Sequence, residues 1–403
     1  MDRLEISEGQ LMSKKGRQIG GVIGILVIFG LVAGGIVVQR QHHQREVKIA
    51  QQQAKIKRQR QAQEAKKQRE SQKVAAAKAK EERLKAESQP TIVAEQALDD
   101  YLKQIGFSGT ALIVRDKQVL LDKGYGSANR AKQLVNTPDT LYAIGSTEKA
   151  LIATSLLQLQ EQGKLNVNDP ISRYLPDFPN GQQIKLTDFL HHTSGIVGRD
   201  QDNQTKTLDQ LIEEIIKNGI KEQPGKWHYM DANYIVLTKV LEKVSHQDYK
   251  TYLKEKILKP SKMAHTGFMT DQYSRLPAAS IGYLANGAAG QLPNFTQLPG
   301  VGDMYMTATD MYRFDRALWT GKLINEQSKA QMFQPGSTSH YGMGFYNDPA
   351  LIINRGYLSG WNVSNGFSHG GRIYIVLFSN EKNEKVSLSK MNGELYTKIT
   401  ATI

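Results

Sequence analysis

Cysteine is absent from all 403 residues of the sequence. Its absence excludes disulfide bonds, thiolate metal sites and a cysteine nucleophile. Histidine is scarce, and the adjacent residues His191 and His192 are poorly suited to share a ligand because neighbouring residues on a helix or strand point in different directions. A metal site is therefore not expected, and no organic cofactor is implied.

The sequence also lacks an even distribution of positive charge. Residues 39–88 contain 15 Lys or Arg against 6 Asp or Glu, and residues 1–18 contain 4 against 3. Once these surpluses of +9 and +1 are subtracted from the total of +13, residues 89–403 carry only +3. A basic tether differs from a basic nucleic-acid-binding face, so nucleic-acid binding is not expected.

One uncharged apolar run, Ile19–Val38, has the 20 residues needed to cross a bilayer as a helix. We interpret it as an uncleaved transmembrane anchor that follows a cytoplasmic segment, residues 1–18. The alternative is a cleaved signal peptide, because Ala33 and Gly35 are small residues at a possible cleavage site. Positive charges are nearly balanced on the two sides, so they do not decide the orientation. The chemistry described below favours a single-pass protein of the cell membrane with its catalytic domain outside the cell.

Residues 39–90 are predicted to form a basic helical stalk. Gln39–Glu87 contains neither glycine nor proline, consists mainly of helix-forming residues, and shows no sustained apolar heptad. Pro90 ends the segment, which would reach roughly 70 Å if it were fully helical. The stalk is either a spacer alone or a spacer that also contacts anionic lipid or a phosphate polymer.

Residues 91–403 have the pattern of a globular domain. A helix is predicted at Val93–Ile105, and a hairpin turns at Asp116-Lys117. A second helix is predicted at Ser146–Gln162, and its stretch Ala150–Leu159 is apolar almost all round and should therefore be buried. The remaining predicted elements are the strands that the hairpin joins, at 110–115 and 118–122, three strands near 352–353, 361–367 and 373–378, and a last helix from about Val386. Strands at both ends around a helical middle predict an α+β fold: an antiparallel sheet flanked by helices, plus a helical lobe.

Ser146 and Lys149 carry the first chemical signal. On a helix, residues three apart face the same side, so the hydroxyl and the amine would meet. A serine in the first turn also lies near free backbone N–H groups at the positive end of the helix dipole. Burial should lower the pKa of the lysine, so that the neutral amine can take the serine proton. The alternative is a helix-capping serine with a surface lysine.

Longer stretches resemble the serine β-lactamase and penicillin-binding-protein family, in the branch of class C β-lactamases and D-alanyl-D-alanine carboxypeptidases. They extend in the family's order over nearly all of residues 91–403 and read FSGTALIVRD, NTPDTLYAIGSTEKALIATSLLQLQEQGKLNVNDPISRYLPDFPNG, IKLTDFLHHTSGI, PGKWHYMDANYIVLTKVLEKVS, VGDMYMTATDMYRF and YIVLFSN.

The resemblance implies a role for each matching residue. Ser146 corresponds to the acylated nucleophile, Lys149 to its general base, and Tyr229 to the tyrosine that relays a proton to the leaving group. The backbone N–H groups of Ser146 and Tyr357 would form the oxyanion hole. His192 lies in a stretch similar to a structural landmark of the family, so we expect it to stabilise a turn.

Two motifs depart from the family pattern. Asp231 stands where the second motif has asparagine. The third motif, normally Lys or His, then Thr or Ser, then Gly, aligns with Asn354-Arg355-Gly356, and the alternative alignment uses His369-Gly370-Gly371. In penicillin-recognising relatives that motif holds the substrate's terminal carboxylate. Its altered form therefore puts β-lactam hydrolysis and ordinary carboxypeptidase activity in doubt.

Arg355 suits a different substrate, because a guanidinium group binds phosphate as well as carboxylate. Some family members with altered third motifs are teichoic-acid D-alanyl esterases, so the resemblance favours a substrate in the cell envelope that carries D-alanine as an ester. A D-alanyl-D-alanine carboxypeptidase-like peptidase and a catalytically weak penicillin-binding or sensor protein are the alternatives. We further expect the charges of Asp231 and Arg355 to compensate each other, either directly or across the substrate.

Overall fold

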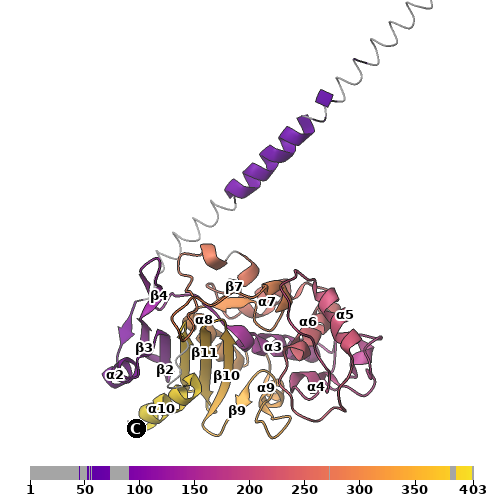
Figure 1. The fold of residues 1–403 in the computed structure, drawn as a ribbon. Coiled ribbons are helices and arrows are strands. Elements are labelled where there is room, and N and C mark those ends of the chain that lie inside the picture. The colour runs from indigo at the N-terminus through magenta and orange to yellow at the C-terminus, as the bar shows by residue number, and fades with distance from the viewer. Residues whose placement is uncertain are drawn as a thin grey trace, which may run out of the picture. The chain divides into compact units, whose positions relative to one another are not determined.

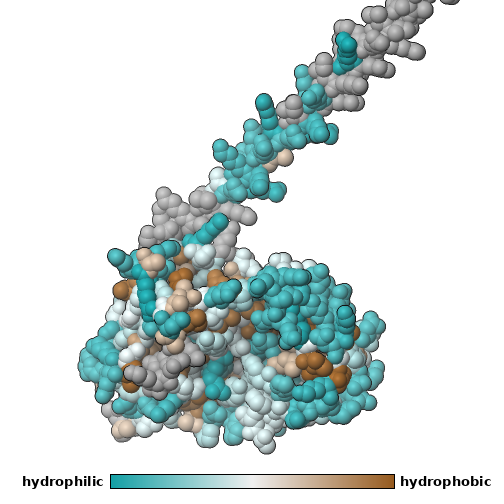
Figure 2. All heavy atoms as spheres, in the orientation of Figure 1, coloured by the Kyte–Doolittle hydropathy of each residue, from teal (hydrophilic) through white to brown (hydrophobic). Residues whose placement is uncertain are grey.

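The computed structural model describes residues 90–271, 273–381 and 387–401, together with residues 57–72 and four single residues, Arg45, Gln52, Gln53 and Lys55. It divides the chain into two units, residues 1–83 and 84–403. In the first unit, residues 57–72 are helical with exposed side chains, and their surface is mostly hydrophilic (Figure 2). None of the described helices is long and apolar enough to cross a membrane. The predicted anchor, Ile19–Val38, and the rest of the predicted stalk lie outside the described residues.

The second unit is built on a seven-stranded sheet in which all neighbours are antiparallel, in the order β1-β3-β2-β12-β11-β10-β9 (Figure 1). The strands are β1 Ile92–Val93, β2 Gly109–Arg115, β3 Gln118–Tyr125, β9 Tyr346–Asn347, β10 Leu351–Leu358, β11 Trp361–Ser368 and β12 Ile373–Ser379. Two small sheets pair β4 Ser127–Asn129 with β5 Leu134–Val135, and β6 Tyr142–Ala143 and β7 Gly267–Phe268 with β8 Met304–Met306.

Helices cover both faces of the large sheet. The α-helices are α2 Gln96–Gln104, α3 Lys149–Glu161, α4 Leu186–Leu190, α5 Leu208–Asn218, α6 Asp231–Ser245, α7 Tyr249–Leu253, α8 Ala308–Trp319, α9 Glu326–Phe333 and α10 Leu388–Ala401. Helices α2 and α10 bury their apolar sides with alternate residues of β2, β3 and β12 in a smaller core. The larger core joins the opposite face of the sheet to α3, α6 and the rest of the helical lobe. The predicted α+β architecture is confirmed.

Two predicted helices begin later than expected. The segment predicted as Val93–Ile105 starts as strand β1, because Ile92 and Val93 pair with β3, and the helix follows only from Gln96. Residues Gly145–Glu148 form a 3₁₀ turn, η1, that continues into α3. The predicted burial of this helix is confirmed, since nearly all of α3 up to Leu159 is buried. The nucleophile candidate therefore sits on a tight turn at the start of a helix that runs through the domain core.

Candidate active site

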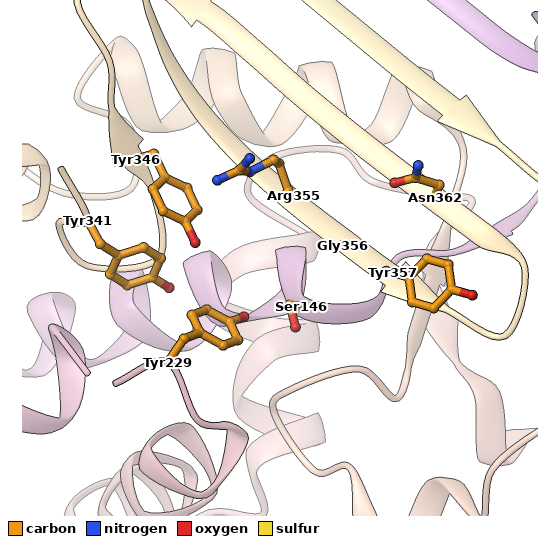
Figure 3. A pocket seen from close by; sticks show the side chains of 9 residues that line it. Ser146, Tyr229, Tyr341, Tyr346, Arg355, Gly356, Tyr357 and Asn362 are labelled. Carbon is orange, nitrogen blue, oxygen red and sulfur yellow. The ribbon is translucent and has the colours of Figure 1, made fainter. Parts of the chain in front are cut away.

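A cavity of about 250 Å³ opens beside η1. The large sheet contributes residues of β9, β10 and β11, and the helical lobe contributes the segment that precedes α6 (Figure 3). The residues that line it are Ser146, Tyr229, Tyr341, Gly344, Tyr346, Arg355, Gly356, Tyr357 and Asn362. Four segments that are far apart in the chain thus meet, and five of the eight predicted site residues are among the lining.

Lys149 joins the serine to the second motif. Its Nζ lies 2.7 Å from the Oγ of Ser146 and 2.7 Å from an Oδ1 of Asp231, and its side chain is 0% exposed. The ammonium donates to both oxygens, so serine, lysine and aspartate form one continuous hydrogen-bonded array. Once the lysine has lost a proton, the same spacing lets its neutral amine accept the proton of the serine hydroxyl, as a lysine-activated nucleophile requires.

The pKa of Lys149 contradicts the expectation from sequence. Burial does lower the pKa of this lysine, but the carboxylate of Asp231, together with Tyr229, more than offsets burial and raises the pKa above its ordinary value. Asp231 is the first residue of α6, where the helix dipole stabilises a negative charge, and its side chain is 37% exposed. The resting site therefore holds a protonated lysine paired with a carboxylate.

His192 holds the loop that carries Tyr229. Its Nδ1 accepts a hydrogen bond from the backbone N–H of Met230 at 3.2 Å and lies 3.1 Å from the Nδ2 of Asn233. The imidazole packs against the Tyr229 ring with centroids 4.2 Å apart. Burial lowers the pKa of His192 well below its ordinary value, with the Lys149 charge adding to the effect, so the ring is neutral and can accept these bonds. The structure thus places His192 in the turn-stabilising role expected of it.

The third motif lies on β10, whose residues alternate between two faces. Asn354 is buried, and its Nδ2 donates to the carbonyl of Thr147 in η1 at 3.4 Å. Arg355 is exposed in the cavity, with its guanidinium carbon 4.2 Å from the Tyr346 ring centroid (Figure 3). The predicted direct pairing of Asp231 with Arg355 is wrong: among the ion pairs of the described ranges, Asp231 binds Lys149. Compensation across a bound substrate remains a prediction.

Gly356 allows β10 to pass very close to η1. A Cβ atom at this position would lie 1.9 Å from the carbonyl oxygen of Ile144, a distance that no side chain can occupy. Gly145 has φ +52°, and a Cβ there would lie 3.0 Å from the backbone nitrogen of Tyr357. The backbones that carry the N–H groups of Ser146 and Tyr357 are therefore adjacent at the cavity, which is what a two-donor oxyanion hole requires.

The alternative third motif lies elsewhere. His369 is exposed and its Nε2 lies 2.9 Å from the carbonyl oxygen of Asp348, while a Cβ at Gly371 would meet the indole of Trp319, and neither residue lines the cavity. The alignment on Asn354-Arg355-Gly356 is the one that reaches Ser146.

Four lining residues were not identified from the sequence: Tyr341, Gly344, Tyr346 and Asn362. The first three belong to the stretch YGMGFY, in which glycines alternate with large side chains. That pattern signals close backbone packing beside an aromatic surface, and it could have marked the segment. In the part of the chain that the structure describes, no cluster of His, Cys, Asp or Glu could hold a metal ion.

Comparison with known proteins gives a consistent result. The family model described as Beta-lactamase matches residues 94–393. A putative penicillin-binding protein, PbpX, of Bacillus subtilis (strain 168) is 46% identical over 323 residues, which cover 79% of this chain and 81% of that protein. A teichoic acid D-alanine hydrolase of Staphylococcus aureus is 33% identical over 318 residues, 75% of each chain.

Solved structures agree with these relatives. FmtA from Staphylococcus aureus superposes with a TM-score of 0.70 at 30% identity, covering 78% of this chain and 90% of that one. A penicillin-binding protein from Bacillus halodurans superposes with a TM-score of 0.65 at 25% identity, covering 77% of this chain and 100% of that one. The chain belongs to the β-lactamase family and is a serine hydrolase of the β-lactamase and penicillin-binding-protein type.

Proposed function

We propose that this serine hydrolase releases D-alanine from D-alanyl esters of teichoic acid, at the outer face of the cell membrane. The observation that carries the proposal is the placement of Arg355 in the same cavity as Ser146. The 33% identity to a teichoic acid D-alanine hydrolase supports it. The apolar run Ile19–Val38 would anchor the protein in the membrane, and the basic segment 39–90 would extend toward anionic lipid or teichoic acid.

Acylation would begin with Lys149 in its neutral form. The amine takes the proton of the Ser146 hydroxyl, and Oγ attacks the D-alanyl carbonyl carbon to form a tetrahedral intermediate. The N–H groups of Ser146 and Tyr357 stabilise the negative charge on the former carbonyl oxygen. The bond to the leaving oxygen then breaks, and that oxygen receives the proton from Lys149 through Tyr229. In the second half of the cycle, water attacks the acyl carbonyl carbon while Lys149 takes its proton. The bond to Oγ of Ser146 then breaks, Lys149 returns the proton to Oγ, and D-alanine leaves.

Arg355 favours a phosphate-bearing substrate over a peptide with a free carboxylate. Carboxylate recognition in penicillin-binding relatives uses a cation at the first motif position and a hydroxyl at the second. Here the first position is Asn354, whose amide is buried against Thr147, and the second is Arg355, which projects into the cavity. An ester also has a better leaving group than an amide, so an ester tolerates a weaker proton relay.

Two other functions are alternatives to D-alanyl ester hydrolysis. One is a D-alanyl-D-alanine carboxypeptidase-like peptidase, with Arg355 binding a peptide carboxylate. The other is a catalytically weak penicillin-binding or sensor protein, which the raised pKa of Lys149 favours, because a protonated lysine cannot accept the serine proton. This second protein would be acylated but would turn over slowly.

The decisive assay is D-alanine release by the full-length protein from purified teichoic acid and, separately, from cell-wall peptide. We expect release from teichoic acid, none by Ser146→Ala, and a reduced rate for Arg355→Thr on the polymer but not on a small uncharged ester. Release from cell-wall peptide alone would establish the peptidase. Acylation by a fluorophosphonate without D-alanine release from either substrate would establish the weak binding protein. A Ser146→Ala variant that is labelled as well as the parent would refute the nucleophile.

A further inference from the structure

Two carboxyl groups lie together in the core, and one of them follows the candidate nucleophile by two residues. Glu148 lies on η1 between Ser146 and Lys149, and Asp303 immediately precedes strand β8. Their side chains are buried, at 0% and 1% exposure. The Oε2 of Glu148 accepts a hydrogen bond from the backbone N–H of Asp303 at 2.8 Å.

Asp303 has more stabilising partners than Glu148. Its Oδ2 accepts a hydrogen bond from the Tyr249 hydroxyl at 2.6 Å and lies 3.4 Å from the Nζ of Lys250. Both of these partners belong to α7. The charge of Lys149 also acts on Glu148, but that ammonium is already paired with Asp231. Lys250 therefore contacts the pair through Asp303 and leaves the carboxyl group of Glu148 without a directly bonded cation in the part of the chain that the structure describes.

The second oxygen of each carboxyl group indicates where the proton lies. The Oε1 of Glu148 and the Oδ1 of Asp303 are both buried without a hydrogen-bond partner among the described residues. Two carboxylates would each leave an acceptor unsatisfied and would repel each other, which is costly in a dry core. Burial raises the pKa of Glu148 well above its ordinary value, and the neighbouring Asp303 charge adds to this effect. The proton therefore belongs on Glu148, whose O–H can donate to Asp303.

We propose that Glu148 and Asp303 share one proton in a direct carboxyl–carboxyl hydrogen bond, and that this bond positions the turn that carries Ser146. The positioning half of the proposal rests on the function proposed for Ser146. Glu148 touches neither substrate nor reacting atoms, so it is a positioning residue. The bond would make the reactivity of the serine dependent on a proton that lies outside the catalytic array.

The surrounding backbone explains how the bond acts on the serine. The N–H of Ile144 donates to the carbonyl of Met304 at 3.1 Å, and a Cβ at Gly302 would lie 3.5 Å from the Cα of Gly145. The η1 turn is thus held against residues 302–304 at its start by backbone contacts and at its end by Glu148. Loss of the proton at alkaline pH would place two negative charges in contact and release the end of the turn.

The test compares three variants of the full-length protein. Glu148→Gln keeps both bonds without a titratable proton, because its amide oxygen accepts from the Asp303 N–H and its NH₂ donates to Oδ1. Glu148→Ala removes both bonds. Glu213→Gln, an exposed carboxyl on α5, is the matched control. The measurements are hydrogen–deuterium exchange of residues 144–150 and fluorophosphonate labelling of Ser146, each as a function of pH.

We expect residues 144–150 of the parent and of the Glu213→Gln variant to lose protection at alkaline pH, while β12 stays protected. In Glu148→Gln, residues 144–150 and β12 should both stay protected. Labelling of Glu148→Ala should be roughly 100-fold slower at neutral pH, which is the cost of displacing a reacting group by about 1 Å. Equal protection profiles for the parent and Glu148→Gln across the pH range would overturn the shared proton.

Exchange does not require a reactive serine, so the two proposals fail separately. Absence of labelling in the parent, with the expected exchange profiles, would refute the function proposed for Ser146 while the carboxyl pair stands. Normal labelling of Glu148→Ala would refute the positioning role.

Discussion

Replacing Asp231 by asparagine should move the activity of Ser146 to lower pH. Only the neutral amine of Lys149 can take the serine proton, and the Asp231 carboxylate raises the pKa of that amine. The rate in the parent should therefore rise with pH. Asparagine keeps an oxygen that can face the lysine but removes the negative charge, so the neutral amine becomes available at lower pH.

The separation of the charges sets the size of the shift. For 2.7 Å between Nζ and Oδ1, the Coulomb relation gives roughly 1.5 kcal/mol in a medium like water and about 6 kcal/mol at an effective dielectric constant near 20. Asp231 is 37% exposed, which places the interaction toward the lower figure. A value of about 2–3 kcal/mol corresponds to roughly 1.5–2 pH units.

The assay is the pH dependence of fluorophosphonate labelling, measured for the parent, for Asp231→Asn and for Asp209→Asn. Asp209 also pairs with a lysine, Lys239, at 2.5 Å, but lies on the surface of α5. We expect the midpoint of the acidic limb to fall by the stated amount for Asp231→Asn alone, with a lower plateau because a less basic amine is a weaker base. A midpoint that stays in place or moves to higher pH would show that Asp231 does not set the protonation of Lys149.

Three further predictions concern strand packing, β-lactam turnover and a buried carboxyl group. Gly356→Ala should lower the free energy of unfolding by about 3 kcal/mol, because its Cβ would meet the Ile144 carbonyl. Gly370→Ala, with open space around it, should change little in the same denaturant titration. Similar losses for both variants would refute the packing argument. Cephalosporin turnover should stay far below roughly 10 per second, because Asn354 and Arg355 replace the carboxylate-binding pair, and spectrophotometric hydrolysis at that rate would contradict this. Burial, aided by Asp139, raises the pKa of Asp122 to about 7. Between pH 4 and pH 7 the folded state therefore binds a proton at Asp122 that the unfolded state does not. The free energy of unfolding should fall by up to about 4 kcal/mol as pH rises through that window. Asp122→Asn should remove this fall in thermal unfolding, and an unchanged pH profile would count against it.

Local patterns in the sequence predicted much of the fold. The hairpin at Asp116-Lys117 and the buried helix after Ser146 depend on residues that are close in the chain, and both were predicted from turn residues and apolar periodicity. The helix predicted from Val93 began late because Ile92 and Val93 pair with β3. That pairing is a tertiary contact, which a local pattern does not contain.

The electrostatics of the site depend on distant residues and were not predictable in the same way. Lys149 sits in an apolar helix, which alone predicts a lowered pKa, but its partner Asp231 is 82 positions away. Glu148 reads as an ordinary helix residue until Asp303, 155 positions away, is seen beside it. The sequence predicts which groups could carry the chemistry, while the folded chain determines which of them hold protons.

The alternation along β10 separates what is fixed in the third motif from what is exchangeable. Asn354 and Gly356 face η1 and are constrained by contacts with Thr147 and Ile144, whereas Arg355 and Tyr357 face outward, the latter 53% exposed. A change at an outward position alters which substrate charge is attracted without disturbing the turn. The charge and size of the outward side chains on this strand can therefore be changed one at a time, while the contacts that hold the turn stay the same.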